Sequence, residues 1–406
     1  MSHSPHNIRT ASAEARGRGA TAALLIAHCA GMLDLVALPV WVGAALIGSM
    51  GLAPAQAGLL VTLFLAGQVM ASLVLAPRFG RWPAQRVIVG GFALATLAFA
   101  SLFLVQTYVL MALLHALGGI GAGTALSCVH GLMGRSANPH RVFAMAGLAL
   151  GLFGILVLGS GPVIVEKAGA ATLFVLFALA TFTAAVAALM WLGQSQSVAE
   201  NQADSSAPTS TQLKAPIPKV VWMGMLGIGC MSLANAMLFS FVERIGMDRG
   251  YGLQTVTSIL IGVGLFNLVP PVLAALLEKR LAAGRVLLAG PVCQLLLALA
   301  VTQVQSLWLF AFAAVVWVGV MIFTHTFLFG LIARLDTSGR ALAATPAMLM
   351  IGSAIGPLLA GVLVDASGYQ GLGLMVAMVA VLAFGCFLRL QWATDNRAAV
   401  VPRSSH

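Results

Sequence analysis

The sequence contains few charged residues. Only 8% of its 406 residues are charged and 60% are hydrophobic, whereas about 25% of the residues of an ordinary soluble domain are charged. This shortage excludes a soluble domain. Runs of roughly 20 apolar residues, each long enough to cross a bilayer as a helix, recur along nearly the whole chain. They do not alternate with polar residues, which excludes a transmembrane β-barrel. The composition therefore predicts an all-α integral membrane protein.

Cysteines are also few, and none is paired in a CxxC motif. The five cysteines lie singly in separate apolar segments, which argues against a disulfide framework and against a metal site. The glycine-rich run at 118–123 lies within a predicted helix and follows no strand, so it is not a dinucleotide-binding motif. Clustered catalytic groups at one membrane face, which a membrane-embedded enzyme needs, are missing. We therefore expect no enzymatic activity, no cofactor and no metal.

Twelve apolar segments predict twelve transmembrane helices. A Ser, Gln, Ala and Pro-rich stretch separates the sixth from the seventh and predicts a flexible linker. The segments lie near residues 20–44, 54–76, 86–105, 107–133, 142–165, 171–193, 219–244, 252–277, 285–303, 306–333, 341–364 and 370–392. The predicted organisation is an N-terminal tail at 1–19, a six-helix bundle at 20–193, a linker at 194–218, a second six-helix bundle at 219–392 and a C-terminal tail at 393–406.

The basic residues predict the orientation of the chain. Eighteen of the 21 lysines and arginines fall in the tails, the linker and alternate loops, and only Lys167, Arg244 and Arg249 fall on the opposite side. Lysine and arginine accumulate in cytoplasmic loops. We therefore expect both termini in the cytoplasm and a multi-pass protein of the inner (cytoplasmic) membrane. Contact with anionic lipid head groups accounts for the formal charge of +10 without nucleic acid, and we expect a monomer.

The loop after the second predicted helix resembles a motif of the major facilitator superfamily. In that family Gly, Asp, Arg, Gly and Arg recur in a tight basic turn. In "APRFGRWPAQRV" (76–87), Arg78, Gly80 and Arg81 match this pattern, while Pro77 stands where the family has Asp. The resemblance implies that this turn holds the cytoplasmic ends of the two halves together when the protein opens outward.

Two further stretches are similar to the same family. "HALGGIGAG" (115–123) resembles its Arg-x-x-x-Gly-x-Gly pattern, with His115 in the Arg position, and "GSGP" (159–162) resembles the fifth helix of antiporter members. The resemblance extends over residues 20–392. It implies a twelve-helix, two-bundle transporter that works by alternating access, closest in motif pattern to proton-coupled exporters.

A Gly-Pro pair occurs in the fifth predicted helix and another in the eleventh. Proline lacks the N–H group that a helix interior requires, so the helix can bend there. Paired interruptions at corresponding positions of two halves suit alternating access. We expect helix bends at Gly161–Pro162 and Gly356–Pro357.

One carboxyl group lies inside a predicted span. Ten of the eleven acidic residues fall in tails, loops or the last turn of a helix, and only Asp34, in "AHCAGMLDLVALPV" (27–40), remains. The residues on the same helical face as Asp34 are mostly small, so we expect the Asp34 side chain to point inward. A charge at mid-membrane costs about 2.5–3.5 kcal/mol on insertion scales, and desolvation favours the protonated form. We predict that Asp34 couples transport to protons. The alternatives are a structural hydrogen bond to a neighbouring helix and a substrate contact without proton coupling.

Other polar side chains in the spans are candidates for the same machinery. His115 is a second candidate for proton coupling, because histidine titrates near neutral pH and the family's Arg at this position is linked to coupling. The residues predicted to line the substrate cavity are Gln68, Asn235, Asn267, Trp317 and His325. Hydrogen-bonded packing is the alternative role for each.

These features predict a proton-coupled exporter of small amphipathic organic molecules. The preference for export rests on the resemblance in the fifth helix. The spans also lack an internal lysine or arginine that would bind an anion. The alternative is a proton symporter that imports a small organic nutrient.

Overall fold

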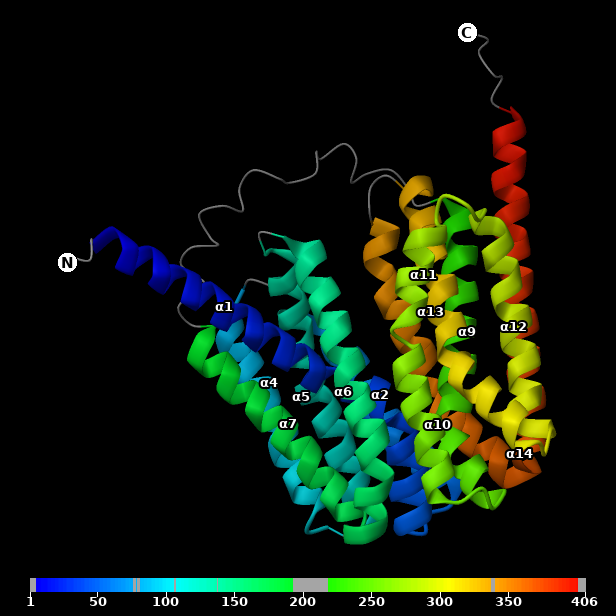
Figure 1. Cartoon of the computed structure of the whole chain (residues 1–406), viewed down its shortest axis with the longest axis horizontal. Coiled ribbons are helices and arrows are strands. Elements are labelled where there is room, and N and C mark those ends of the chain that lie inside the picture. Colours follow the sequence, from blue (N-terminus) through cyan, green and yellow to red (C-terminus); the bar gives the residue numbers. More distant parts are fainter. Residues whose placement is uncertain are drawn as a thin grey trace. The chain divides into compact units, whose positions relative to one another are not determined.

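The structure is a computed structural model (Figure 1). It describes residues 5–75, 78, 81–105, 107–136, 138–192, 218–336 and 340–400. These residues form helices and no strand. The helices are α1 (Pro5–Gly31), α2 (Leu33–Pro39), the π-helix η1 (Val40–Ser49), α3 (Pro54–Leu75), α4 (Ala84–Leu102), α5 (Tyr108–Gly134), α6 (Pro139–Ala168), α7 (Ala170–Trp191), α9 (Lys219–Asp248), α10 (Leu253–Phe266), α11 (Val269–Leu277), α12 (Ala283–Gln303), α13 (Leu307–Leu335) and α14 (Arg340–Val400).

The helices account for the twelve predicted crossings. Within the described ranges, ten are long and apolar enough to span a membrane, and a pair bent by 43° at Met32 forms an eleventh. α14 has 61 residues, about 90 Å of helix at 1.5 Å per residue, which is far more than one bilayer requires. Gly368 interrupts it with a φ of 65°, so α14 contains two crossings. The all-α membrane fold is confirmed, although the first helix already begins at Pro5.

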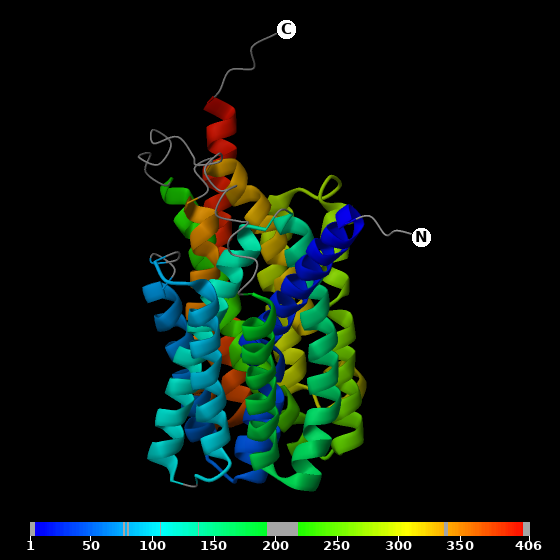
Figure 2. The same cartoon turned by 90° about the vertical axis from the view of Figure 1, so that its left-hand side faces the viewer.

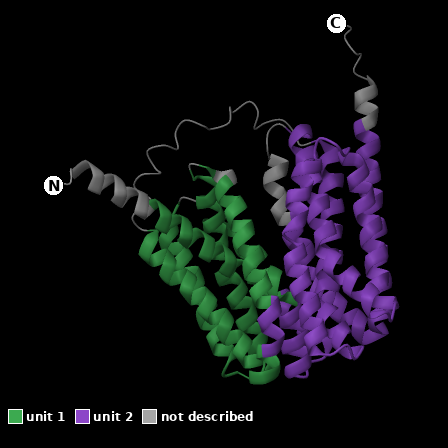
Figure 3. Cartoon of the chain, viewed as in Figure 1, with its two compact units in different colours: residues 1–38, 63–157, 164–207 green, residues 39–62, 158–163, 208–406 purple. Residues whose placement is uncertain are grey.

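The chain divides into two compact units (Figure 3). Unit 1 comprises residues 1–38, 63–157 and 164–207, and unit 2 comprises residues 39–62, 158–163 and 208–406. Segments 39–62 and 158–163 lie within the first predicted bundle, yet their contacts place them in unit 2. The predicted bundle boundaries stay a prediction.

Unit 1 is built on α4, which packs against α5 and α7 (Figure 2). Ile88, Phe92, Val129 and Met133 are fully buried between these helices. Small residues let the backbones approach closely: Gly121 of α5 lies against the backbone of α4. Packing of this kind drives helix association in lipid, where apolar burial alone gives no advantage.

Unit 2 is built around α9, whose neighbours are α14, α12, α13, η1 and α10. Met225 and Ile228 of α9 are buried together with Leu328 and Phe387. Gly356 of α14 also faces this helix, because a Cβ built on it would lie 3.0 Å from the backbone N of Met237.

Asp365 of α14 caps the start of α3 within unit 2. Its Oδ2 accepts a hydrogen bond of 2.9 Å from the backbone N–H of Ala55, one of the N–H groups that a helix start leaves without a partner. We expect Asp365→Ala to lower the free energy of unfolding by about 0.5–1 kcal/mol, measured by thermal unfolding in detergent. Asp365→Asn keeps an acceptor and should recover part of this loss. An unchanged melting temperature for Asp365→Ala would contradict the capping role.

Candidate functional site

Asp34 lies next to a break in the first span. α1 ends at Gly31 and α2 begins at Leu33, and the two parts are bent by 43°. Asp34 is in the first turn of α2. The break needs no proline, since the first proline of this span, Pro39, comes only at the end of α2. Broken membrane helices are used in transporters to present backbone and side-chain polar groups at mid-membrane.

Gln68 of α3 joins the two sides of this break. Its Nε2 donates a hydrogen bond of 2.7 Å to the carbonyl oxygen of Gly31. The Gln68 amide and the backbone N–H groups of Asp34 and Leu35 also interact favourably with the charge of the Asp34 carboxylate. Two residues predicted separately, Asp34 for proton coupling and Gln68 for the cavity, therefore lie together in unit 1.

The Asp34 carboxyl retains free hydrogen-bonding capacity. Its Oδ1 is shielded and has no hydrogen-bond partner within the described part of the chain, while the residue as a whole is only partly buried. A fully satisfied structural carboxylate has partners for both oxygens. This carboxyl can instead carry a proton on Oδ1 or accept a hydrogen bond from a ligand.

The histidine predicted for proton coupling, His115, is fully buried in α5. Its Nδ1 donates to the Met111 carbonyl oxygen at 2.7 Å, and its ring meets the edge of Phe174 in α7. A different histidine pair, not predicted from the sequence, joins α1 to α5: His28 Nδ1 and His130 Nε2 are 3.1 Å apart. No spacing along the chain indicates this pair, because its members are 102 residues apart.

The other residues predicted for the cavity all lie in unit 2. Trp317 Nε1 donates to the backbone oxygen of Asn235 at 3.4 Å, which joins α13 to α9. His325 Nδ1 donates to the carbonyl oxygen of Met321, one turn earlier. Asn267 occupies the break between α10 and α11, and its Oδ1 is shielded without a hydrogen-bond partner in the described structure. A cavity role for these residues stays a prediction.

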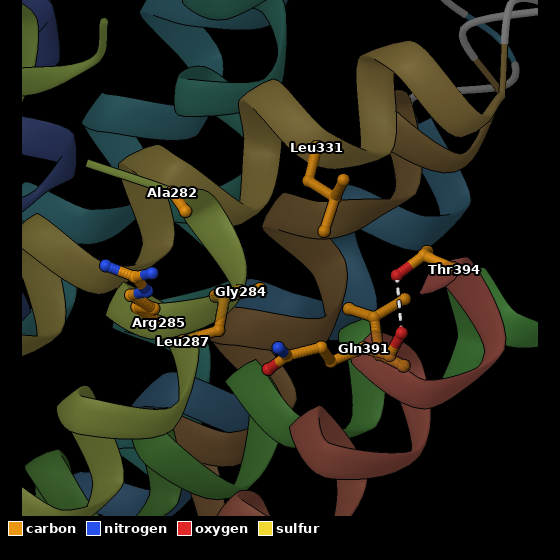
Figure 4. Close-up of a pocket in the computed structure, with 8 residues that line it drawn as sticks. Ala282, Gly284, Arg285, Leu287, Leu331, Gln391 and Thr394 are labelled. Atoms are coloured by element: carbon orange, nitrogen blue, oxygen red, sulfur yellow. Dashed lines mark hydrogen bonds between the residues drawn. The ribbon is translucent and has the colours of Figure 1, made fainter. Parts of the chain in front are cut away.

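Unit 2 contains two cavities that are not lined by the residues predicted for the substrate cavity. Figure 4 shows a cavity of about 170 Å³, where Arg285 and Leu287 lie across from Gln391 and Thr394. The second cavity, of about 380 Å³, is almost entirely apolar and lies between α11, α12 and α13, with Cys293 among its lining residues. Neither cavity is lined by an acidic residue.

The basic turn after α3 is partly described. The Arg81 N–H donates to the Arg78 carbonyl oxygen at 3.1 Å, which is the tight turn that the motif predicts. Both arginine side chains are exposed. Gly80 and Pro77 lie outside the described residues. The gating role of the turn stays a prediction.

The two Gly-Pro pairs lie within continuous helices. α6 continues through Pro162, and the interruption inside α14 falls at Gly368, after Pro357. The Leu358 N–H donates to Thr62 Oγ1 of α3 at 3.1 Å. Gly161 makes room for Val40, whose Cγ1 would lie 2.8 Å from an added Cβ. Bending at these pairs during transport stays a prediction.

The expectation that only Asp34 is an internal acid was wrong. Glu243, in the last turns of α9, is 2% exposed. The neighbouring Arg244 and Asp248 form an ion pair of 2.7 Å, which in sequence makes the whole stretch look like a solvated helix end. The residue that covers Glu243 is Gly43 of η1, and no local pattern connects two positions so far apart in the chain.

Solved transporter structures share this fold. A crystal structure of a bacterial homologue of the human lysosomal transporter Spinster, inward-facing and unoccupied, matches with a TM-score of 0.70 and 13% identity, over 96% of this chain and 99% of that chain. The nucleoside transporter NupG matches with a TM-score of 0.69 and 14% identity, over 91% and 99% of the two chains. At such identities the likeness concerns the fold alone.

Comparison at the level of sequence gives the family. No curated protein matches the chain significantly. The model of the Major Facilitator Superfamily matches residues 23–336, which include the Asp34 break, the basic turn and the glycine-rich α5. Since this match covers more than half of the sequence, the chain belongs to the major facilitator superfamily of membrane transporters.

Proposed function

We propose that the protein is a proton-coupled exporter of small amphipathic organic cations. The observation that carries this proposal is the Asp34 carboxyl at the break of the first span, with Gln68 beside it and Oδ1 unpartnered. A carboxyl in this setting can exchange a proton for a positively charged substrate. Each pH unit across the membrane then supplies about 1.4 kcal/mol per proton.

The sign of the buried charge supports a cationic substrate. Among the described residues, the buried ionisable side chains include the acids Glu243 and Asp336 and two histidines, but no lysine or arginine. A buried positive charge would favour an organic anion, whereas a buried carboxylate favours a cation as its partner. The proposal includes an inner-membrane location, with both termini and the linker in the cytoplasm, as the distribution of basic loops predicts.

Transport into inverted membrane vesicles tests the proposal. With the lumen acidified by one pH unit, exchange of one proton for one monovalent cation should accumulate tetraphenylphosphonium about tenfold in the lumen, because one unit of pH corresponds to a tenfold ratio. Vesicles without the protein and vesicles whose pH gradient has been collapsed with ammonium are the controls. Both should stay at a ratio near unity.

The importing symporter is the alternative outcome. A symporter would empty preloaded acidic vesicles of a neutral or anionic nutrient and leave tetraphenylphosphonium untouched. A thermal-shift screen of the purified protein against organic cations, nucleosides, organic acids and sugars separates the substrate classes before transport is measured. Stabilisation by a nucleoside or sugar, and by no cation, would overturn the cationic proposal.

A further inference from the structure

Glu243 is a buried acid that forms no ion pair among the described residues. It lies in the last turns of α9 and is 2% exposed, and its Oε2 has no hydrogen-bond partner among the described residues. Burying an ionised carboxylate without a partner is strongly unfavourable, and the group becomes neutral instead. The arrangement is therefore suited to a carboxyl that carries a proton.

Gly43 of the π-helix η1 packs directly against this carboxyl group. A Cβ built on Gly43 would collide with Glu243 Oε2 and would lie 3.1 Å from the backbone N of Arg244. Any side chain at position 43 would thus fill the space that the carboxyl occupies. Ten residues of π-helix are also exceptional, because π-helical geometry is normally limited to single turns and is frequent at functional sites.

The charged groups around Glu243 form their ion pairs and hydrogen bonds with other residues, although the Arg244 charge also acts on the Glu243 carboxyl and Arg249 Nη1 is buried without a hydrogen-bond partner in the described structure. Arg244 Nη2 pairs with Asp248 Oδ1 at 2.7 Å, and the Tyr369 hydroxyl of α14 donates to the other oxygen of Asp248. Arg249 Nη2 donates to the Thr302 carbonyl oxygen of α12 at 2.9 Å.

Among the described side chains, none from the other elements packed on α9 forms an ion pair with Glu243. Asp365 of α14 is bound to the start of α3. Phe310 of α13 lies under the Arg249 guanidinium, 5.4 Å from its ring centre. The sequences of η1 and α10 contain no titratable residue. Glu243 is thus covered by Gly43, and its Oε2 has neither a hydrogen bond nor an ion pair among the described residues.

We propose that Glu243 is a second proton-binding site, distinct from Asp34, and that a proton on its carboxyl is required for η1 to close on α9. When the O–H bond breaks, the proton passes to water that enters as η1 moves away, and the carboxylate is hydrated there. Reprotonation restores the closed contact. This contact lies at the end of α9 remote from the linker, and through the proposed proton coupling it links opening at that end to proton release.

Cysteine accessibility in the purified protein tests the proposal without any substrate. In a variant lacking the five native cysteines, Ala45→Cys places a thiol at a fully buried position of η1 and Ser49→Cys places one at an exposed position. Labelling of position 45 by an impermeant maleimide is divided by labelling of position 49. The quotient removes the general rise of thiol reactivity with pH.

We expect this quotient to rise at least about tenfold between pH 5.5 and 8.5, and to stay low at every pH in Glu243→Gln. Glu166→Gln removes an exposed carboxyl at the end of α6 and should leave the rise unchanged. A pH-dependent rise that persists in Glu243→Gln would overturn the proposal, and so would a rise that follows Na⁺ concentration at fixed pH. Because glutamine is a neutral isostere of the protonated acid, failure of Glu243→Gln to fold would also overturn it.

The same assay separates this proposal from the proposed function. Asp34→Asn should keep the pH-dependent quotient even where transport is lost. If the wild-type protein showed no proton-driven transport but its labelling quotient rose with pH, the proposed exporter would be rejected and the Glu243 site retained. If it transported normally but its labelling quotient did not change with pH, the Glu243 site would be rejected and the exporter retained.

Discussion

Asp34→Asn is expected to reduce proton-driven accumulation of an organic cation from about tenfold, at one unit of pH gradient, to a ratio near unity. Asparagine keeps the size of the side chain and an oxygen that can still accept from Gln68, but it cannot exchange a proton. The substitution therefore separates titration from hydrogen bonding. Exchange of labelled for unlabelled cation without a pH gradient needs no net proton movement, so it measures substrate binding and conformational change apart from proton coupling.

The measurement compares gradient-driven accumulation with exchange in the same vesicles. Asp34→Glu retains a titratable group and should restore part of the accumulation, while Glu166→Gln should behave as the unmodified protein. If Asp34→Asn accumulated cation as well as the unmodified protein, Asp34 would be a structural hydrogen-bonding partner of Gln68 and nothing more. If exchange were lost as well, the Asp34 carboxylate would also be the group that binds the cation; if exchange continued, the cation would bind elsewhere and Asp34 would carry the proton alone.

Gly119→Ala is expected to have the largest effect on stability. Gly119 of α5 packs directly on the backbone of α3, where an added Cβ would lie 2.6 Å from the carbonyl carbon and 2.8 Å from the Cα of Phe64. Backbone cannot move aside as a flexible side chain does, so the helices must separate. Overpacking of this kind costs about 1–3 kcal/mol or more, and we expect the melting temperature in detergent to fall by several degrees.

The neighbouring glycine is the matched control. Gly118 belongs to the same sequence motif, but the nearest atom to a Cβ there would be the Ala98 Cβ at 3.6 Å, an ordinary contact. Alanine is also the better helix former, so Gly118→Ala should leave the melting temperature unchanged or raise it slightly. Equal losses for the two variants would show that the close contact of Gly119 with α3 is not what makes glycine necessary there.

Much of the fold follows from the sequence because each crossing is specified locally. A run of about 20 apolar residues indicates a membrane span, and the prolines at the start of α3 and α6 mark where helices begin. The late break of α14 at Gly368 falls between two such runs and was predicted as a loop. The start of α1 was predicted too late, because polar residues before the membrane can continue a helix that the bilayer does not require.

Residues of the candidate site could be predicted from the sequence only where a polar residue lies in an otherwise apolar span. Asp34 and Gln68 are polar residues in apolar helices, so composition identifies them. Glu243 sits among charged neighbours, and its burial depends on Gly43, which belongs to another helix. The bend beside Asp34 also has no proline to announce it. Such features depend on which helices meet, and periodicity within one helix does not contain that information.

The ten residues of η1 make the first span sensitive to its length. Each residue of an α-helix turns the chain by about 100°, and a π-helix holds more residues in every turn. Deleting one residue between Val40 and Gly43 would therefore change which residue of η1 faces Glu243, while leaving hydrophobicity and charge intact. Apolar substitutions along this stretch, except at Gly43, are compatible with the arrangement, whereas a deletion is not. In an alignment of related chains, the residue types in this stretch should therefore vary, while the number of residues stays constant.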